Sequence, residues 1–125
     1  MVCNINLAPT ILGAAGLKFE QNIDGENILS LFQTPPKKWR SSVFCETHGH
    51  LQPHVGRMVV KGKFKYIYNK KQKEELYDLY NDPYELMNLV DDINYTTTLK
   101  AMRNELREWQ KKTNDPEKDK ESIDS

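Results

Sequence analysis

Three histidines fall within seven residues, at His48, His50 and His54, and form the sharpest local signal for chemistry in the chain. On an extended segment the rings of His48 and His50 point the same way, and the third lies within loop reach, so a zinc site is conceivable. Cys45 and Glu46 are the nearest further ligands, but the set matches no established zinc spacing. From the residues alone, a solvent-exposed loop rich in histidine is the better interpretation.

Strands are predicted on both sides of this histidine segment. Residues 42–47 alternate in side-chain character and form the first strand, and residues 58–61 and 64–68 follow as a hairpin. Gly62 lies between the hairpin strands, where a tight turn requires a residue that tolerates positive φ. A further short strand, the fourth, is predicted over residues 76–79.

Helices are predicted towards both ends of the chain. Residues 6–15 are apolar and rich in helix formers, and residues 26–33 have the pattern of a short amphipathic helix. Asp-Pro-Tyr-Glu at 82–85 has the form of a helix start, so a short helix should cover residues 84–89. The longest predicted helix covers residues 96–112. Four of its apolar residues repeat at spacings of three and four and share one face: Leu99, Met102, Leu106 and Trp109.

The totals limit the classes of partner. A chain of 125 residues is expected to form one domain, because it is too short for two ordinary ones. Its 18 basic and 18 acidic residues give a formal charge of zero, so neither nucleic acid nor an anionic membrane is expected to bind it. Six lysines between Lys61 and Lys73 could form a nucleic-acid stripe with Tyr66 and Tyr68, but the solvated face of a hairpin is the better interpretation.

No run of about 18 apolar residues and no signal peptide occurs, so the chain is expected to be soluble. Cys3 and Cys45 are expected to be free thiols. Residues 113–125 carry almost no apolar side chains and are expected to form a disordered, charged tail. If the chain is the end of a longer protein, any signal lies upstream, and a periplasmic, secreted or lysosomal location of the parent stays open.

Several short motifs follow one another in a distinctive order. The hairpin carries Lys-Tyr-Ile-Tyr-Asn (65–69), and Glu-Leu-Tyr-Asp-Leu (75–79), Asp-Pro-Tyr-Glu (82–85) and Asn-Leu (88–89) come after it, with Asn-Leu-Ala-Pro-Thr (6–10) far upstream. In this order they closely resemble the C-terminal region of sulfatases of the alkaline-phosphatase-like superfamily, such as arylsulfatases and N-sulfoglucosamine sulfohydrolases. The resemblance covers roughly residues 5–115.

This resemblance implies an α+β fold, in which a small antiparallel sheet of about four strands packs against a long C-terminal helix and short helices precede the sheet. Residues 1–112 would form the sulfatase C-terminal-like domain. Within it, residues 1–40 would be the end of the catalytic domain and residues 41–112 the C-terminal subdomain.

The parent reaction implied by the resemblance is hydrolysis of a sulfate ester or sulfamate on a carbohydrate. The loop after the first strand would face the substrate cleft. His48, His50 and Arg57 would donate hydrogen bonds to sulfate or sugar oxygens, and Glu46 would accept from a hydroxyl or orient His48.

Sulfatases also need a Cys/Ser-x-Pro-x-Arg motif, whose first residue becomes formylglycine, and a calcium ion. Cys3 and Cys45 lie in other contexts, so this chain is expected to hold no catalytic residue and no metal ligand, and to be inactive alone. Formylglycine and calcium are expected in an N-terminal catalytic domain of the same parent, the chain's main partner beside the sulfated saccharide. The alternative is a non-catalytic binding module that uses the loop from His48 to Arg57 for an anionic ligand or partner protein.

Overall fold

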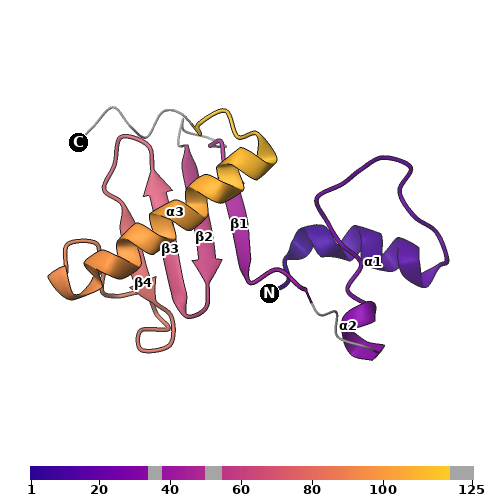
Figure 1. The fold of residues 1–125 in the computed structure, drawn as a ribbon, viewed down its shortest axis with the longest axis horizontal. Helices are drawn as coiled ribbons and strands as arrows, with labels where there is room; N and C mark the ends of the chain where they lie inside the picture. The colour runs from indigo at the N-terminus through magenta and orange to yellow at the C-terminus, as the bar shows by residue number, and fades with distance from the viewer. Residues whose placement is uncertain (34–37, 50–54, 119–125) are drawn as a thin grey trace. The chain divides into compact units, whose positions relative to one another are not determined.

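The computed structural model describes residues 1–33, 38–49 and 55–118, and the chain divides into two compact units. The first unit is Met1–Val43 and the second is Phe44–Ser125. Figure 1 shows the elements of each unit along the chain. Each unit is described by itself.

In the first unit a short 3-10 helix, η1 (Asn4–Asn6), leads into α1 (Leu7–Ala14), and α2 is limited to Ser30–Gln33. The predicted helix over 6–15 is therefore confirmed, whereas the one over 26–33 begins four residues late. The backbone just before α2 is not helical; it is held by hydrogen bonds to two side chains, those of Asn6 and Thr10. The Asn6 amide donates to the carbonyl of Glu26 over 2.7 Å, and the Thr10 hydroxyl accepts from the amide of Ile28 over 3.1 Å.

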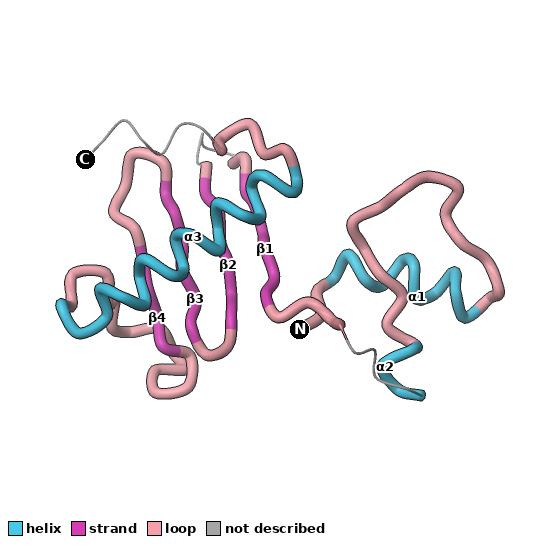
Figure 2. The backbone as a smooth tube through the Cα atoms, in the orientation of Figure 1, coloured by secondary structure: helices cyan, strands magenta, loops and turns pink. Residues whose placement is uncertain are grey.

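The sheet has four strands in the order β1-β2-β3-β4: β1 (Ser42–Thr47), β2 (Gly56–Lys61), β3 (Phe64–Asn69) and β4 (Glu75–Asp78). β2 pairs antiparallel with β3, and β3 pairs antiparallel with β4. Figure 2 shows the short connections between consecutive strands β2, β3 and β4. The turn of the hairpin is made by Gly62, whose φ of 58° is favourable for glycine.

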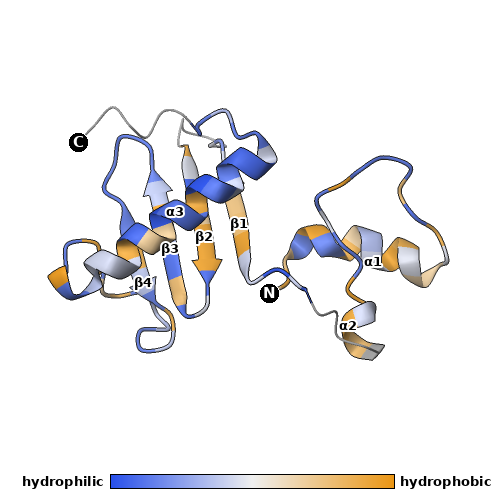
Figure 3. Ribbon diagram, viewed as in Figure 1, coloured by the Kyte–Doolittle hydropathy of each residue, from blue (hydrophilic) through white to orange (hydrophobic). Residues whose placement is uncertain are grey.

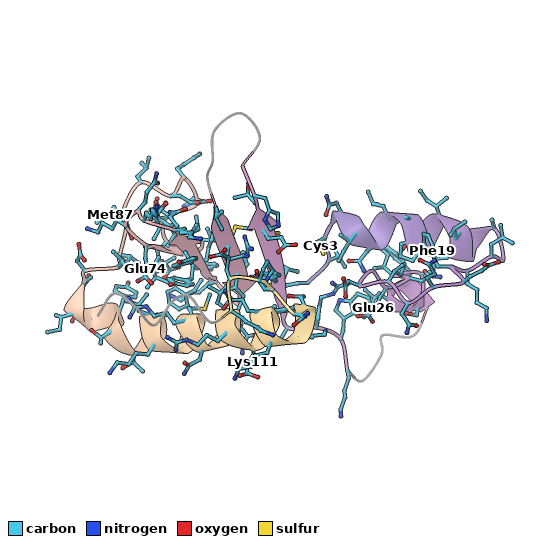
Figure 4. All side chains as sticks on the ribbon, turned by 90° about the horizontal axis from the view of Figure 1, so that it is seen from above. Cys3, Phe19, Glu26, Glu74, Met87 and Lys111 are labelled. Carbon is cyan, nitrogen blue, oxygen red and sulfur yellow. The ribbon has the colours of Figure 1, made fainter. Side chains whose placement is uncertain are left out.

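One face of the sheet is covered by α3 (Thr96–Thr113), as Figure 1 and the view from above in Figure 4 show. Phe44 of β1 stacks on Trp109 with ring centroids 6.2 Å apart. The predicted α+β architecture is confirmed, and side-chain periodicity explains it, because alternate strand residues and every third or fourth helix residue meet. The buried hydrophobic core consists of Val59, Tyr66, Leu76, Leu99, Met102 and Leu106.

The predicted helix over 84–89 is wrong. Glu85, the second residue of the predicted helix, has a left-handed φ of 56°, and a right-handed helix cannot contain that conformation. The Glu85 carboxylate pairs with Lys65 of β3. The following backbone is held against β4, where the amide of Leu89 donates to the carbonyl of Leu76 over 2.8 Å. Tertiary hydrogen bonds therefore override the local start signal in this segment.

Residues 114–118 of the predicted tail are among those that the structure describes. Asn114 ends α3 in the left-handed conformation, and Asp115 and Glu117 are buried. The reason is electrostatic: Asp115 pairs with Arg57 of β2, and Glu117 pairs with Lys70, which directly follows β3. The rest of the predicted tail, residues 119–125, lies outside the described residues.

Candidate functional site

The candidate site lies where β1 ends. Glu46 and His48 are two residues apart, so the extended backbone directs both side chains to the same side. The Glu46 carboxylate lies 3.7 Å from the His48 imidazole, and the two side chains are 45% and 60% exposed. The next residue, Gly49, has a φ of 77°, which turns the chain away from the strand. This exposed pair offers a hydrogen-bond acceptor beside an imidazole that can donate or accept.

Arg57 lies behind this pair rather than beside it on the surface. Its side chain is fully buried, with Nε 3.7 Å from the Glu46 carboxylate. Nη1 donates to the carbonyls of Thr47, over 3.1 Å, and Gly56, over 2.8 Å. The structure thus places Arg57 close to Glu46 and His48. The hydrogen bonds of its guanidinium, however, are made to groups of the protein itself. The fourth predicted site residue, His50, and the possible zinc ligand His54 lie outside the described residues.

The main partner of Arg57 is Asp115, a residue that the sequence did not predict for the site. Nε and Nη2 donate to the two carboxylate oxygens of Asp115 over 2.6 and 2.7 Å, a bidentate pair in which both side chains are fully buried. Burial alone raises the pKa of the Asp115 carboxyl, but hydrogen bonds from Arg57 and the backbone outweigh it and hold the pKa below its ordinary value. The hydrogen bond to Asp115 in turn raises the pKa of Arg57.

A second missed pair lies beside the first. The ammonium group of Lys70 lies 3.0 Å from the Glu117 carboxylate, and the amide of Lys70 donates to the carbonyl of Val55 over 2.9 Å. No local pattern marks these residues, because the partners are 47 positions apart and both looked like ordinary charged residues. Asp115 and Glu117 are two of several charged residues in this tail, so their charge alone did not distinguish them.

Five of the six lysines between Lys61 and Lys73 are engaged with carboxylates. Such pairing neutralises the charge that a phosphate backbone would need. The arrangement favours the interpretation of a solvated hairpin face over a nucleic-acid stripe. Five pairs are seen: Lys61–Glu105, Lys63–Asp78, Lys65–Glu85, Lys70–Glu117 and Lys73–Asp91.

The described residues do not fit the cofactors of a sulfatase. Within residues 1–33, 38–49 and 55–118, no group of three or more His, Cys, Asp or Glu side chains could hold a metal ion. Cys3 and Cys45 are free thiols, and neither stands in a Cys-x-Pro-x-Arg sequence. The described part of the chain also contains no helix of the length and hydropathy that a membrane span requires.

Two relatives in sequence are sulfatases. The sulfatase YidJ of Escherichia coli is 31% identical over 116 residues, which is 92% of this chain and 23% of that protein. The N-acetylglucosamine-6-O-sulfatase of Bacteroides thetaiotaomicron is 28% identical over 130 residues, which is 96% of this chain and 23% of that protein. The chain therefore spans about a quarter of the length of these two sulfatases.

A similar solved structure is a protein in complex with its substrate, D-glucosamine-2-N,6-O-disulfate. It superposes with a TM-score of 0.78 and 25% sequence identity, over 94% of this chain and 25% of that one. The family model for the C-terminal region of N-sulphoglucosamine sulphohydrolase matches residues 1–112, nearly the whole chain. The chain therefore belongs to the family of sulfatase C-terminal domains of the N-sulphoglucosamine sulphohydrolase type.

Proposed function

We propose that this chain is the C-terminal part of a sulfatase that hydrolyses sulfate groups on a carbohydrate. The observation that carries the proposal is the family match over residues 1–112. The named substrates of the similar proteins, a sulfated N-acetylglucosamine in one and a disulfated glucosamine in the other, support a sulfated amino sugar as the substrate class. The nucleophile, the calcium ion and its ligands belong to an N-terminal catalytic domain in this proposal, and the chain completes the fold and the substrate pocket.

Within this function, Glu46 and His48 contact the substrate. Both are exposed at the end of β1, on a rigid sheet, where loop residues commonly bind ligands. A sulfated sugar presents hydroxyl donors that suit a carboxylate and sulfate oxygens that suit an imidazole N–H. Arg57 supports these two residues from behind and is not itself a ligand, since its guanidinium is buried against Asp115.

The surface of the first unit supports the proposal of a catalytic-domain partner. Helix α1 is apolar, as Figure 3 shows, yet none of its residues is buried. Leu7 and Ile11 are among the exposed large hydrophobic residues, as are Leu17 and Phe32 elsewhere in this unit. Exposed apolar surface of this extent is typical of a face that another part of a protein covers.

The first test concerns the isolated chain. With a chromogenic aryl sulfate and added calcium, we expect no turnover, because the chain lacks a formylglycine precursor motif. Turnover that is abolished by a substitution within residues 1–125 would contradict this proposal. The DNA upstream of the Met1 codon should encode Cys/Ser-x-Pro-x-Arg, and its absence there would instead favour a non-catalytic binding module.

The second test uses the full-length parent. We expect His48→Ala and Glu46→Gln each to lower kcat/KM for a sulfated saccharide by about tenfold, which corresponds to about 1.4 kcal/mol of lost transition-state stabilisation. Glu108→Gln is the matched control, because this carboxylate is exposed on α3 and pairs with Lys111. Wild-type kinetics in both site variants would contradict the proposal and show that Glu46 and His48 belong to an ordinary solvated loop.

A further inference from the structure

The segment that follows α3 is an ordered strap, which we define as residues 114–118 and name the C-terminal strap. It turns back on itself: the amide of Asp115 donates to the carbonyl of Gln110 over 2.9 Å, and the amide of Glu117 donates to the Asp115 carboxylate over 3.0 Å. In Figure 1 it is the yellow loop at the end of the sheet where β1 ends and β2 begins. The match to the family model stops at residue 112, before this strap.

Through Arg57, the strap is connected to both ends of the segment that joins β1 to β2. Asp115 fixes one edge of the guanidinium, and Nη1 on the other side donates to the carbonyl of Thr47 and to that of Gly56. These carbonyls belong to the last residue of β1 and the first residue of β2. The planar guanidinium makes four hydrogen bonds to these three groups, one more than the three N–H donors of an ammonium group allow.

Asp115 also competes with Glu46 for hydrogen bonds from the Arg57 guanidinium. The guanidinium is 2.6 Å from the buried carboxylate of Asp115 and 3.7 Å from the half-exposed carboxylate of Glu46. The shorter, bidentate pair takes Nε and Nη2 and leaves the Glu46 carboxylate without a hydrogen bond from Arg57 among those seen. Glu46 therefore keeps its exposed oxygens beside His48.

We propose that Asp115 and Arg57 are positioning residues, by which the C-terminal strap holds the end of β1 and keeps Glu46 and His48 available for a ligand. That the ligand is a sulfated saccharide rests on the proposed function, whereas the positioning itself does not. Removing the Asp115 charge frees Arg57 to turn to Glu46, which draws the Glu46 carboxylate inwards and away from His48.

Two truncated chains test whether the strap acts on the site. The chain of residues 1–118 keeps the strap, and the chain of residues 1–113 lacks it. In ¹H–¹⁵N spectra we expect the amide signals of Thr47, His48 and Gly49 to be unchanged in the first and clearly shifted in the second. Equal spectra for these three residues in both truncated chains would overturn the proposal.

A double-mutant cycle tests the competition for Arg57, using Asp115→Asn, Glu46→Gln and the double variant. We expect Asp115→Asn to shift the His48 ring and amide signals, and to do so much less in the Glu46→Gln background, because the competing acceptor has lost its charge. Additive shifts would overturn the proposal. If Asp115→Asn fails to fold, Glu117→Gln takes its place, because it removes the strap's ion pair with Lys70 and leaves the pair of Asp115 with Arg57 intact. We expect it to shift the His48 signals in the same way but by less.

In the full-length parent, Asp115→Asn should raise KM for a sulfated saccharide about threefold or more while kcat changes by less than about twofold, as expected for misplaced binding groups. Asp115→Glu should restore part of the loss, whereas Arg57→Lys should not. If the spectra change as expected but Glu46→Gln and His48→Ala leave the kinetics unaltered, the substrate assignment fails and the positioning stands. If those two variants lose activity but Asp115→Asn has wild-type KM and spectra, the positioning fails and the function stands.

Discussion

The two units of the chain differ in what they bury. The second unit, Phe44–Ser125, encloses a core of six hydrophobic residues between the sheet and α3. In the first unit, Met1–Val43, the buried residues among those described are Asn6 and Ser42, both polar, while many large apolar side chains are exposed. Because apolar burial is the main favourable term in folding, the second unit contains the means of its own stability and the first does not.

This difference fits the roles that we propose for the two units. A unit with its own core can act as a rigid support for Glu46 and His48. A unit with an uncovered apolar helix is suited to pack against further protein, which in this proposal is the catalytic domain. The resemblance implied that the catalytic domain ends at residue 40 and the C-terminal subdomain begins at residue 41, and this boundary stays a prediction.

The largest expected effect comes from separating the two units. A chain of residues 41–125, which keeps all of β1, should unfold cooperatively with a melting temperature within a few degrees of that of the whole chain. A chain of residues 1–40 should show no cooperative transition, because it cannot bury enough apolar surface. Circular dichroism melts of both chains check this prediction. A sharp transition in residues 1–40 would show that the contrast between the units is misjudged.

A smaller effect is expected from truncating one side chain in each unit. Leu106→Ala removes a fully buried core residue of α3 and should lower the free energy of unfolding by about 3 kcal/mol. Ile11→Ala is the matched control: this side chain on α1 is 68% exposed, and its loss should cost less than about 0.5 kcal/mol. Urea denaturation of the whole chain measures both. Comparable losses for the two variants would contradict the assignment of the core to the second unit.

The smallest effect concerns stability in acid, and it also belongs to the second unit. The hydrogen bond from Lys63 lowers the pKa of Asp78 against the effect of burial. Burial raises the pKa of Asp115, but the hydrogen bonds from Arg57 and from the backbone together outweigh it and lower that pKa. A carboxyl whose pKa is lowered by folding contributes stability that is complete above its unfolded pKa, about 3.9, and is lost as the pH falls through the folded value.

We therefore expect the melting temperature of the whole chain to be insensitive to these two groups between about pH 5 and 7 and to fall steeply below about pH 4. Asp115→Asn and Asp78→Asn should each be less stable than wild type near neutrality and should lose less on acidification. Melts across this pH range measure the difference. If the melting temperature falls equally steeply below about pH 4 in wild type and in both variants, other carboxylates cause the loss of stability in acid.

Much of the fold could be predicted because its signals are local. Alternation over residues 42–47 and 64–68 reflects a strand with two unlike faces, and the repeat of Leu99, Met102 and Leu106 reflects one buried helix face. The errors fell where contacts distant in sequence compete with local signals. Residues 84–89 have a good helix start, yet Lys65 and the backbone of Leu76 hold them in another conformation.

For the site, the amino-acid sequence by itself determined that Glu46 and His48 share one side of a strand end, because the period of an extended chain requires it. The partner of Arg57 was decided by the tertiary structure alone. Asp115 lies 58 positions away in a segment whose composition predicts disorder, and no pattern within either segment refers to the other. Packing α3 on the sheet brings the end of that helix to the start of β2, and there a buried guanidinium requires a carboxylate.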